Sequence, residues 1–145
     1  GARRIVGSHG IPVEADVTVD DAPEADLVVL PGGMPGADNL GKSDAVRALV
    51  ERAHDAGKRV AAICAAPAMA LGRTSLLDGK RATCYPGFEK HFPAGVTHVD
   101  DPVVTDGRVV TSRGVGTALE FSLALVEQLV SKEKAEQLRR AMLVS

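Results

Sequence analysis

Apolar residues recur along the chain in short continuous runs separated by amphipathic stretches, which is typical of parallel strands alternating with helices. The runs at 25–33 ("ADLVVLPGG") and 59–64 ("RVAAIC") predict two buried strands. Between them, apolar residues at helical spacing predict a helix over 44–57, with Ser43 as its N-cap. These short strand–helix–strand connections predict an α/β fold with a doubly wound, mostly parallel sheet.

The second half of the chain continues this alternation. In order, the pattern predicts a helix at 66–77 that frays near Gly72, a strand at 80–85, a short helical turn at 86–92 and a weaker strand at 96–99. A hairpin over 102–112 and helices at 118–130 and 131–145 follow. The hairpin follows from an Asp106–Gly107 pair between two β-branched runs. Thr117 and Glu120 fit a capping box for the helix that follows them. At the other end, "GARRIVGSHG" looks like the end of a strand.

Length and composition indicate one globular domain over 1–145, without internal repeats. The chain is 45% apolar and 25% charged but only 3% aromatic, so Val, Leu, Ile and Ala must fill its core. A net charge of −2 does not indicate a basic surface that would bind nucleic acid or an acidic membrane. The longest apolar run, 60–71, is too short to span a bilayer, and no signal peptide is visible, so a cytoplasmic protein is expected. The two cysteines form no CxxC pair and no histidine has zinc spacing, so no metal or cofactor is predicted.

Cys64 is the residue whose placement most suggests chemistry. It ends a predicted strand and is followed almost at once by an Ala-rich helix. A sulfur at such a turn faces unpaired helix N–H groups and the positive end of the helix dipole, which favour an anionic, nucleophilic thiolate. The small residues Ala65 and Ala66 permit the sharp turn of a nucleophile elbow. The alternative is a small buried hydrophobe at a strand end, and the local pattern leaves both open.

Three predicted strands end in loops that an open parallel sheet would bring to one rim. After the first, Gly32 and Gly33 allow close approach of the backbone, so the Gly33 and Ala65 N–H groups could form an oxyanion hole, although a tight turn would also explain the glycines. Tyr85 and Arg113 are candidate pocket residues. Tyr85 is equally well explained by packing, and a structural ion pair is favoured for Arg113.

Two further residues complete the candidates. His9, at another predicted strand end, is the best candidate for a site histidine, whereas His54, in a polar helix stretch, and His91 and His98, in surface-like segments, are expected to be solvated. Cys84 lies inside a strand pattern and is expected to pack in the core.

Four segments together resemble the ThiJ/PfpI superfamily, in the branch of parkinsonism-associated proteins and bacterial protein deglycases: "DLVVLPGGMPGADNL", "VAAICAAPAMAL", "ATCYPGFE" and "VVTSRGVGTALEFSLALVEQL". The resemblance covers nearly the whole chain from about Ile5 onward. It implies a flavodoxin-like, class I glutamine amidotransferase-like α/β fold, a homodimer, and Cys64 as nucleophile and redox-sensitive thiol. It also implies Gly33 and Ala65 as oxyanion donors.

The resemblance implies two kinds of function. One is a cofactor-independent glyoxalase (hydro-lyase) or deglycase (hydrolase) that uses Cys64 on methylglyoxal, glyoxal or their early adducts in carbonyl and oxidative stress defence. The alternative is a non-enzymatic redox-sensing stress protein or chaperone that works through oxidation of Cys64. An accessible, activated thiol serves both equally. A flavin or nucleotide domain is disfavoured because no phosphate-binding loop is present.

The sequence also departs from the family pattern. Ala65 stands where the protease-like branch has His, which argues against that branch. Tyr85 stands where the parkinsonism protein has a His near its nucleophile, and His9 stands where some members have an Arg that reaches the partner subunit's site.

A larger departure concerns the start of the fold. The family begins with a strand–helix–strand unit, whose Glu hydrogen-bonds the catalytic thiol, and this sequence has no counterpart for it. Without that central strand, buried backbone groups would lose their partners. We therefore expect an N-terminal companion fragment of about 40–50 residues from the same polypeptide, supplying the general acid or base.

Overall fold

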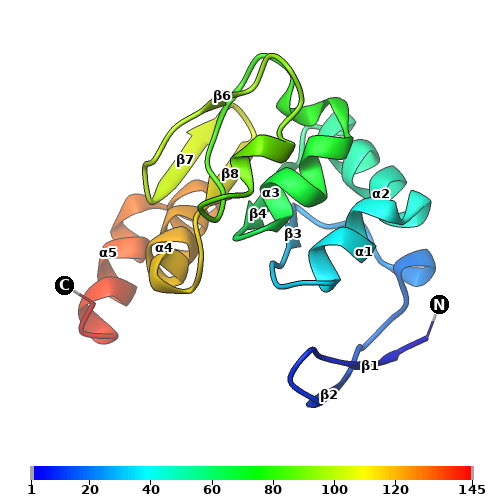
Figure 1. The fold of residues 1–145 in the computed structure, drawn as a ribbon. Helices are drawn as coiled ribbons and strands as arrows, with labels where there is room; N and C mark the ends of the chain where they lie inside the picture. Colours follow the sequence, from blue (N-terminus) through cyan, green and yellow to red (C-terminus); the bar gives the residue numbers. More distant parts are fainter. Residues whose placement is uncertain (1, 145) are drawn as a thin grey trace.

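The central element of the fold is a four-stranded sheet of order β3-β4-β8-β7 (Figure 1). The computed structural model describes residues 2–144. The strands are β3 (Leu27–Leu30), β4 (Arg59–Ile63), β7 (Val103–Asp106) and β8 (Val109–Ser112). β3, β4 and β8 run parallel, and β7 is antiparallel to β8. The predicted mostly parallel sheet is confirmed, and so is the predicted hairpin.

Helices cover both faces of this sheet, as predicted for a flavodoxin-like fold (Figure 1). One face packs against α1 (Gly36–Lys42), α2 (Asp44–Asp55) and α3 (Ala66–Met69). The other packs against α4 (Ala118–Leu129), on which α5 (Lys132–Ala141) lies. Within β4, Val60 and Ala62 enter the first core and Ala61 the second, and all three are fully buried. The continuous apolar run of this strand thus reflects burial on both faces.

One helix start follows the prediction and another does not. Ser43 caps α2, since its hydroxyl accepts a hydrogen bond from the Val46 N–H at 3.3 Å. The capping box predicted for α4 is wrong: Thr117 makes no side-chain bond to the helix that follows it. Its hydroxyl turns back to the preceding loop, where it accepts from the Gly114 N–H at 3.1 Å and lies 2.6 Å from Ser112 Oγ. The hydroxyl therefore fixes the loop rather than the helix.

The helix predicted at 66–77, with fraying near Gly72, is α-helical only in its first turn. After α3 the chain forms two short 3-10 turns, η2 (Leu71–Arg73) and η3 (Ser75–Leu77). The Thr74 hydroxyl explains the break, because it donates to the Leu71 carbonyl at 2.7 Å and accepts from the Leu76 N–H at 3.2 Å. Such local side-chain bonds compete with the helical hydrogen-bond pattern.

The strand predicted at 80–85 is much shorter in the structure. Only β5 (Arg81–Ala82) forms, and it pairs in parallel with β6 (Thr97–His98) in a separate two-stranded sheet. The turn η4 (Glu89–His91) lies between them. Beyond β5, the Thr83 N–H donates to Thr111 Oγ1 at 3.0 Å, and the Tyr85 N–H donates to the Cys64 carbonyl at 2.8 Å. This segment is therefore anchored to the ends of the central strands without extending a ladder.

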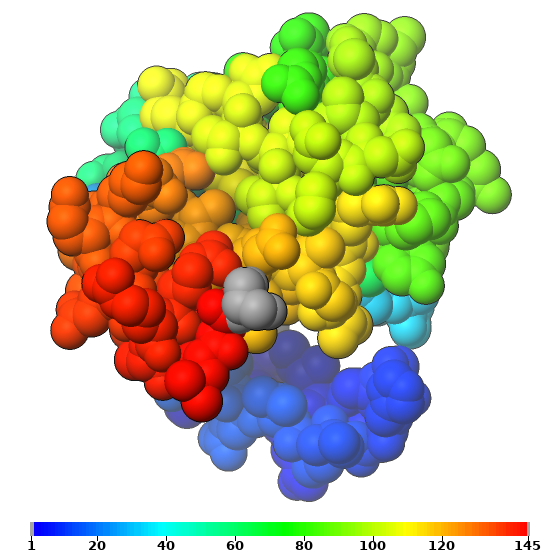
Figure 2. Space-filling view, turned by 90° about the vertical axis from the view of Figure 1, so that its left-hand side faces the viewer, coloured from blue at the N-terminus to red at the C-terminus, as the bar shows by residue number. Residues whose placement is uncertain are grey.

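The N-terminal segment stands apart from this body (Figures 1 and 2). A strand is present where the sequence predicts one, β1 (Arg4–Val6), but it forms an antiparallel hairpin with β2 (Pro12–Glu14), which was not predicted. Both strands are exposed, and η1 (Val19–Asp21) leads from them to β3. Within residues 2–144, β3 forms one edge of the main sheet. No helix in this range is long and apolar enough to cross a bilayer.

Candidate active site

Cys64 occupies a strained turn between β4 and α3. Its φ of 66° lies in the left-handed region, which it shares with only one other non-glycine residue among those described, Leu143. This conformation costs a side-chain-bearing residue roughly 1–2 kcal/mol. The turn is held from both sides, since the Cys64 N–H donates to the Ser112 carbonyl at 3.0 Å and its carbonyl accepts from Tyr85. The structure thus has the sharp elbow that the sequence predicts.

The glycine loop after β3 lies directly against this elbow. A Cβ at Gly32 would be 2.4 Å from Cys64 Cβ and 2.8 Å from the Ile63 carbonyl oxygen, so only glycine fits there. Gly33 has a φ of 84°, which glycine adopts readily. Neither Gly33 nor Ala65 donates its N–H in any of the turn and loop hydrogen bonds described for residues 2–144. Both groups are therefore free to serve as oxyanion donors, a role that stays a prediction.

Tyr85 and Arg113 lie together along an open hollow next to the elbow, with Gly114 and Thr117. Tyr85 is 48% exposed, and a Cβ at Gly114 would lie 3.2 Å from its ring. The absence of that Cβ lets the ring rest on the 113–116 loop. Arg113 is bound to Asp100, with 3.3 Å from Nη1 to the carbonyl oxygen and 3.6 Å from Nη2 to Oδ1. This ion pair supports the structural role that the sequence favours for Arg113.

His9 lies in the exposed turn between β1 and β2. Its Nδ1 is 3.3 Å from the Ser8 hydroxyl. No hydrogen bond or ion pair described within residues 2–144 joins it to Cys64, Tyr85 or Arg113. The structure therefore does not bring this histidine to the elbow, and its place in the site stays a prediction.

Cys84 differs sharply from Cys64 in its surroundings. It is 1% exposed, whereas Cys64 is partly accessible. Burial, together with the nearby Glu89 carboxylate, raises the pKa of the Cys84 thiol to about 12. Cys84 is therefore a protonated thiol at neutral pH, in agreement with the expected packing position.

The residues that fix the elbow were missed in the sequence. Ser112 is fully buried, and its hydroxyl donates to the Pro102 carbonyl at 2.7 Å while contacting Thr117. The Ser112 carbonyl accepts the hydrogen bond from the Cys64 N–H that holds the elbow in place. The polar positions of "VTSRGVGT" were a signal, since a serine ending an otherwise buried strand needs hydrogen-bond partners.

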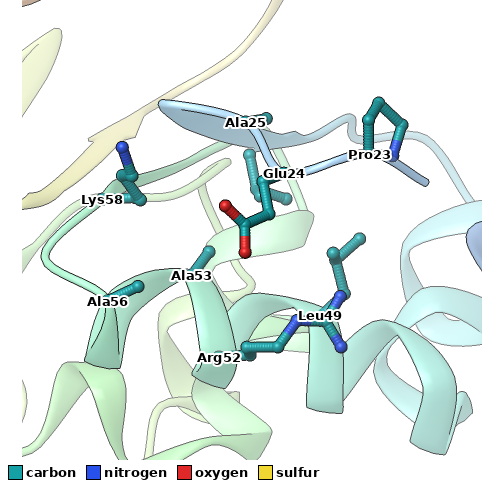
Figure 3. Close-up of a pocket in the computed structure, with 9 residues that line it drawn as sticks. Pro23, Glu24, Ala25, Leu49, Arg52, Ala53, Ala56 and Lys58 are labelled. Atoms are coloured by element: carbon teal, nitrogen blue, oxygen red, sulfur yellow. The ribbon is translucent and has the colours of Figure 1, made fainter.

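A separate apolar hollow lies at the opposite end of β3, between the segment before that strand and α2 (Figure 3). Glu24, Arg52 and Lys58 stand around it with Leu49 and Ala53. Its volume of about 50 Å³ is far below the several hundred Å³ of typical ligand sites. The open hollow lined by Tyr85, Arg113 and Gly114, with a volume of about 380 Å³, is the better candidate for substrate binding.

A flavodoxin-like sheet with a cysteine on a left-handed elbow, faced by a Gly-Gly loop, defines a class of α/β proteins with a partly accessible cysteine at a strand end. The model of the DJ-1/PfpI family matches residues 1–128 of this chain. The chain belongs to this family, which confirms the ThiJ/PfpI resemblance seen in the sequence.

The relatives show how far the likeness extends. Protein DJ-1 homolog B of Arabidopsis thaliana is 47% identical over 88% of this chain, which spans only 30% of the length of that relative. The glutathione-independent glyoxalase DJR-1.2 of Caenorhabditis elegans is 33% identical over 93% of this chain and 73% of its own length. The solved structure of oxidized Toxoplasma gondii DJ-1 superposes with a TM-score of 0.89 at 36% identity, over 98% of this chain and 78% of that one.

Proposed function

We propose that this protein is a cysteine-dependent glyoxalase or deglycase acting on small α-oxoaldehydes and their early adducts. The observation that carries the proposal is the Cys64 elbow, with its φ of 66° and with Gly32 packed against the side chain. The likeness to a relative named as a glyoxalase, over 93% of this chain, supports the same chemistry. The site needs no redox cofactor, because the conversion of an α-oxoaldehyde to a hydroxy acid is an internal redox reaction.

The steps follow from an activated thiolate. Cys64 Sγ attacks the aldehyde carbon of methylglyoxal to form a hemithioacetal, and the Gly33 and Ala65 N–H groups stabilise the developing oxyanion. A proton then moves from the former aldehyde carbon to the neighbouring carbon through an enediol, which gives a thioester. Water hydrolyses the thioester, releases lactate and regenerates the thiol. The net reaction is methylglyoxal plus water to lactate.

The test measures lactate formed from methylglyoxal by the full chain, in the assembly it forms in solution, against Cys64→Ser. We expect the substitution to abolish turnover and leave the unfolding midpoint close to that of the parent protein. His54→Gln, which replaces a histidine in the last turn of α2, is the control for a substitution outside the site. A Cys64→Ser protein that retains lactate formation would overturn the proposal.

A redox-sensing role is the second candidate, and the oxidised Toxoplasma relative favours it. Here Cys64 is oxidised by a peroxide to the sulfenate and then the sulfinate. Mass spectrometry after peroxide treatment separates the candidates: sulfinate at Cys64 in a protein without lactate formation would favour the sensor. Unmodified Cys64 in a protein with turnover would favour the enzyme.

A further inference from the structure

Three side chains with metal-binding groups lie close together in the segment from β5 to β6, next to the Cys64 elbow. Cys84 follows β5, Glu89 begins η4, and His98 ends β6. The thiol sulfur, a carboxylate oxygen and an imidazole nitrogen all lie within 4.8 Å of one another. The proposed catalytic steps use none of these three groups.

The backbone around each group is fixed by its own contacts. Cys84 lies between two anchored residues, since the N–H groups of Thr83 and Tyr85 donate to the ends of β8 and β4. Residue 98 is held in register opposite Ala82 in the β5–β6 ladder. Three separate elements therefore converge on one point without help from a bound ligand.

The two solvent-facing groups keep capacity for a further ligand. One Glu89 oxygen, Oε2, accepts from the Gly87 N–H at 2.6 Å, which orients the carboxylate, and the two carboxylate oxygens have further lone pairs for a ligand. The His98 ring is 30% exposed, lies 6.2 Å from the Phe92 ring, and has its Nε2 3.9 Å from Asp100 Oδ1. A carboxylate beside a histidine ligand is a common orienting partner in metal sites.

The geometry points to a zinc site formed by Cys84, Glu89 and His98, with water in the fourth position. Zinc accepts this mixture of sulfur, nitrogen and oxygen donors, and three protein ligands plus water are usual in its open sites. Tetrahedral coordination brings ligand atoms to about 3.4–3.8 Å from one another. The present separations of up to 4.8 Å need a closure of about 1 Å, within the reach of side-chain rotation in Glu89 and His98.

The charges around the cluster also suit a divalent cation. On binding, the ion displaces the thiol proton to solvent, so a thiolate and a carboxylate together balance its two charges. The Arg113 guanidinium, whose charge acts on Cys84, is already paired with Asp100. Packing alone explains the buried Cys84, and capping of the 87–89 turn explains Glu89, but neither explains why His98 meets both.

The experiment titrates the metal-free full chain with Zn²⁺ and, as a spectroscopic probe, with Co²⁺. We expect one equivalent to bind, a sulfur-to-cobalt charge-transfer band, and a rise in thermal midpoint with Zn²⁺ concentration. Cys84→Ala should remove the band, and His98→Gln and Glu89→Gln should each weaken binding more than about tenfold. Gln at 89 keeps an oxygen for the Gly87 N–H, so the turn is preserved.

Matched controls separate this site from the elbow. Cys64→Ser removes the other thiol, and His91→Gln replaces a histidine of the same segment that lies outside the cluster. Both should retain the charge-transfer band and the affinity. Three results would each overturn the inference. They are a charge-transfer band that is lost in Cys64→Ser, metal binding that the three ligand substitutions leave unchanged, and no metal binding at all. Because none of these readouts is turnover, the outcome does not depend on the proposed enzymatic function.

Discussion

Two apolar segments of this molecule, the strand β4 and the N-terminal hairpin, differ in how far their side chains are buried. In β4, Val60, Ala61 and Ala62 are completely buried, because helices cover both faces of the sheet and strands flank both edges. In the N-terminal ribbon (the hairpin formed by β1 and β2), Ile5, Val6, Ile11 and Val13 remain 60–67% exposed. An isolated two-stranded ribbon has no second layer to pack against and gains little from its apolar residues. Hydrophobic pattern thus marks what a segment can bury, and the packed layers decide what it does bury.

The largest expected effect is the contrast in stability between these regions. Leu71 is fully buried in the core between the sheet, α1 and α3, so Leu71→Ala should lower the free energy of unfolding by about 2–5 kcal/mol. Ile11→Ala, a comparable truncation at a 67% exposed position, should change it by less than about 0.5 kcal/mol. Urea unfolding of both variants checks this. Equal losses would mean that the ribbon is packed in solution.

A second contrast uses two glycines near the same end of β3. Gly32→Ala places a Cβ 2.4 Å from Cys64 Cβ and against backbone at Ile63, so we expect a loss of roughly 1–3 kcal/mol. Gly36→Ala, in open space at the start of α1, should be neutral or stabilise by up to about 1 kcal/mol. Unfolding curves measure both, and the rate of thiol alkylation reports on the elbow. An unchanged alkylation rate in Gly32→Ala would show that the loop does not shape the site.

The sequence could predict what depends on local pattern. The strands β3, β4, β7 and β8 and the helix α2 with its Ser43 cap follow from apolar runs, helical spacing and turn residues. The sequence could not predict where a helix breaks or how it is capped when a single threonine hydroxyl decides this. Each hydroxyl can form hydrogen bonds with several neighbouring backbone groups, and the sequence does not show which of them it chooses. Thr74 breaks a helix and Thr117 leaves its cap for the preceding loop.

The candidate site divides in the same way. The elbow at Cys64 and the nearby glycines could be predicted, since a strand end, small residues and a Gly-Gly pair are all visible in the chain. The meeting of Cys84, Glu89 and His98 could not, because their spacing matches no metal motif. It arises only when β5 pairs with β6 and the turn between them folds back.

A third prediction concerns the strain at the elbow. Cys64→Gly removes the Cβ that disfavours a positive φ, whereas Cys64→Ala removes the thiol and keeps the Cβ. After the greater unfolded-state entropy of glycine is subtracted, we expect the Gly variant to be more stable than the Ala variant by about 0.5–1 kcal/mol. Both should lack turnover. Chemical unfolding side by side measures the difference, and an Ala variant as stable as the Gly variant would show that the turn is relaxed in solution.

The smallest expected effect again contrasts the body with the ribbon. Hydrogen bonding from Lys42, opposed by partial desolvation and reinforced by Arg73, lowers the pKa of Asp38. Its carboxylate joins α1 to η2, at 2.5 Å from Lys42 Nζ and 2.8 Å from Arg73 Nη2. Because the folded pKa is below the unfolded value, the ionised carboxylate stabilises the fold above the unfolded pKa. That contribution is lost as the pH falls through the folded pKa.

Asp38→Asn should therefore be less stable than the parent chain at pH 7, and the difference should shrink as the pH is lowered through the acid range. Glu14→Gln breaks the exposed pair that Glu14 forms with Arg3 in the ribbon, where the charged atoms are 3.7 Å apart. It should leave the free energy of unfolding unchanged at every pH, because exposed pairs contribute little. Urea titrations across the acid range measure both variants. If Asp38→Asn behaved like Glu14→Gln, the two ion pairs of Asp38 would contribute no more to stability than the exposed pair between Arg3 and Glu14.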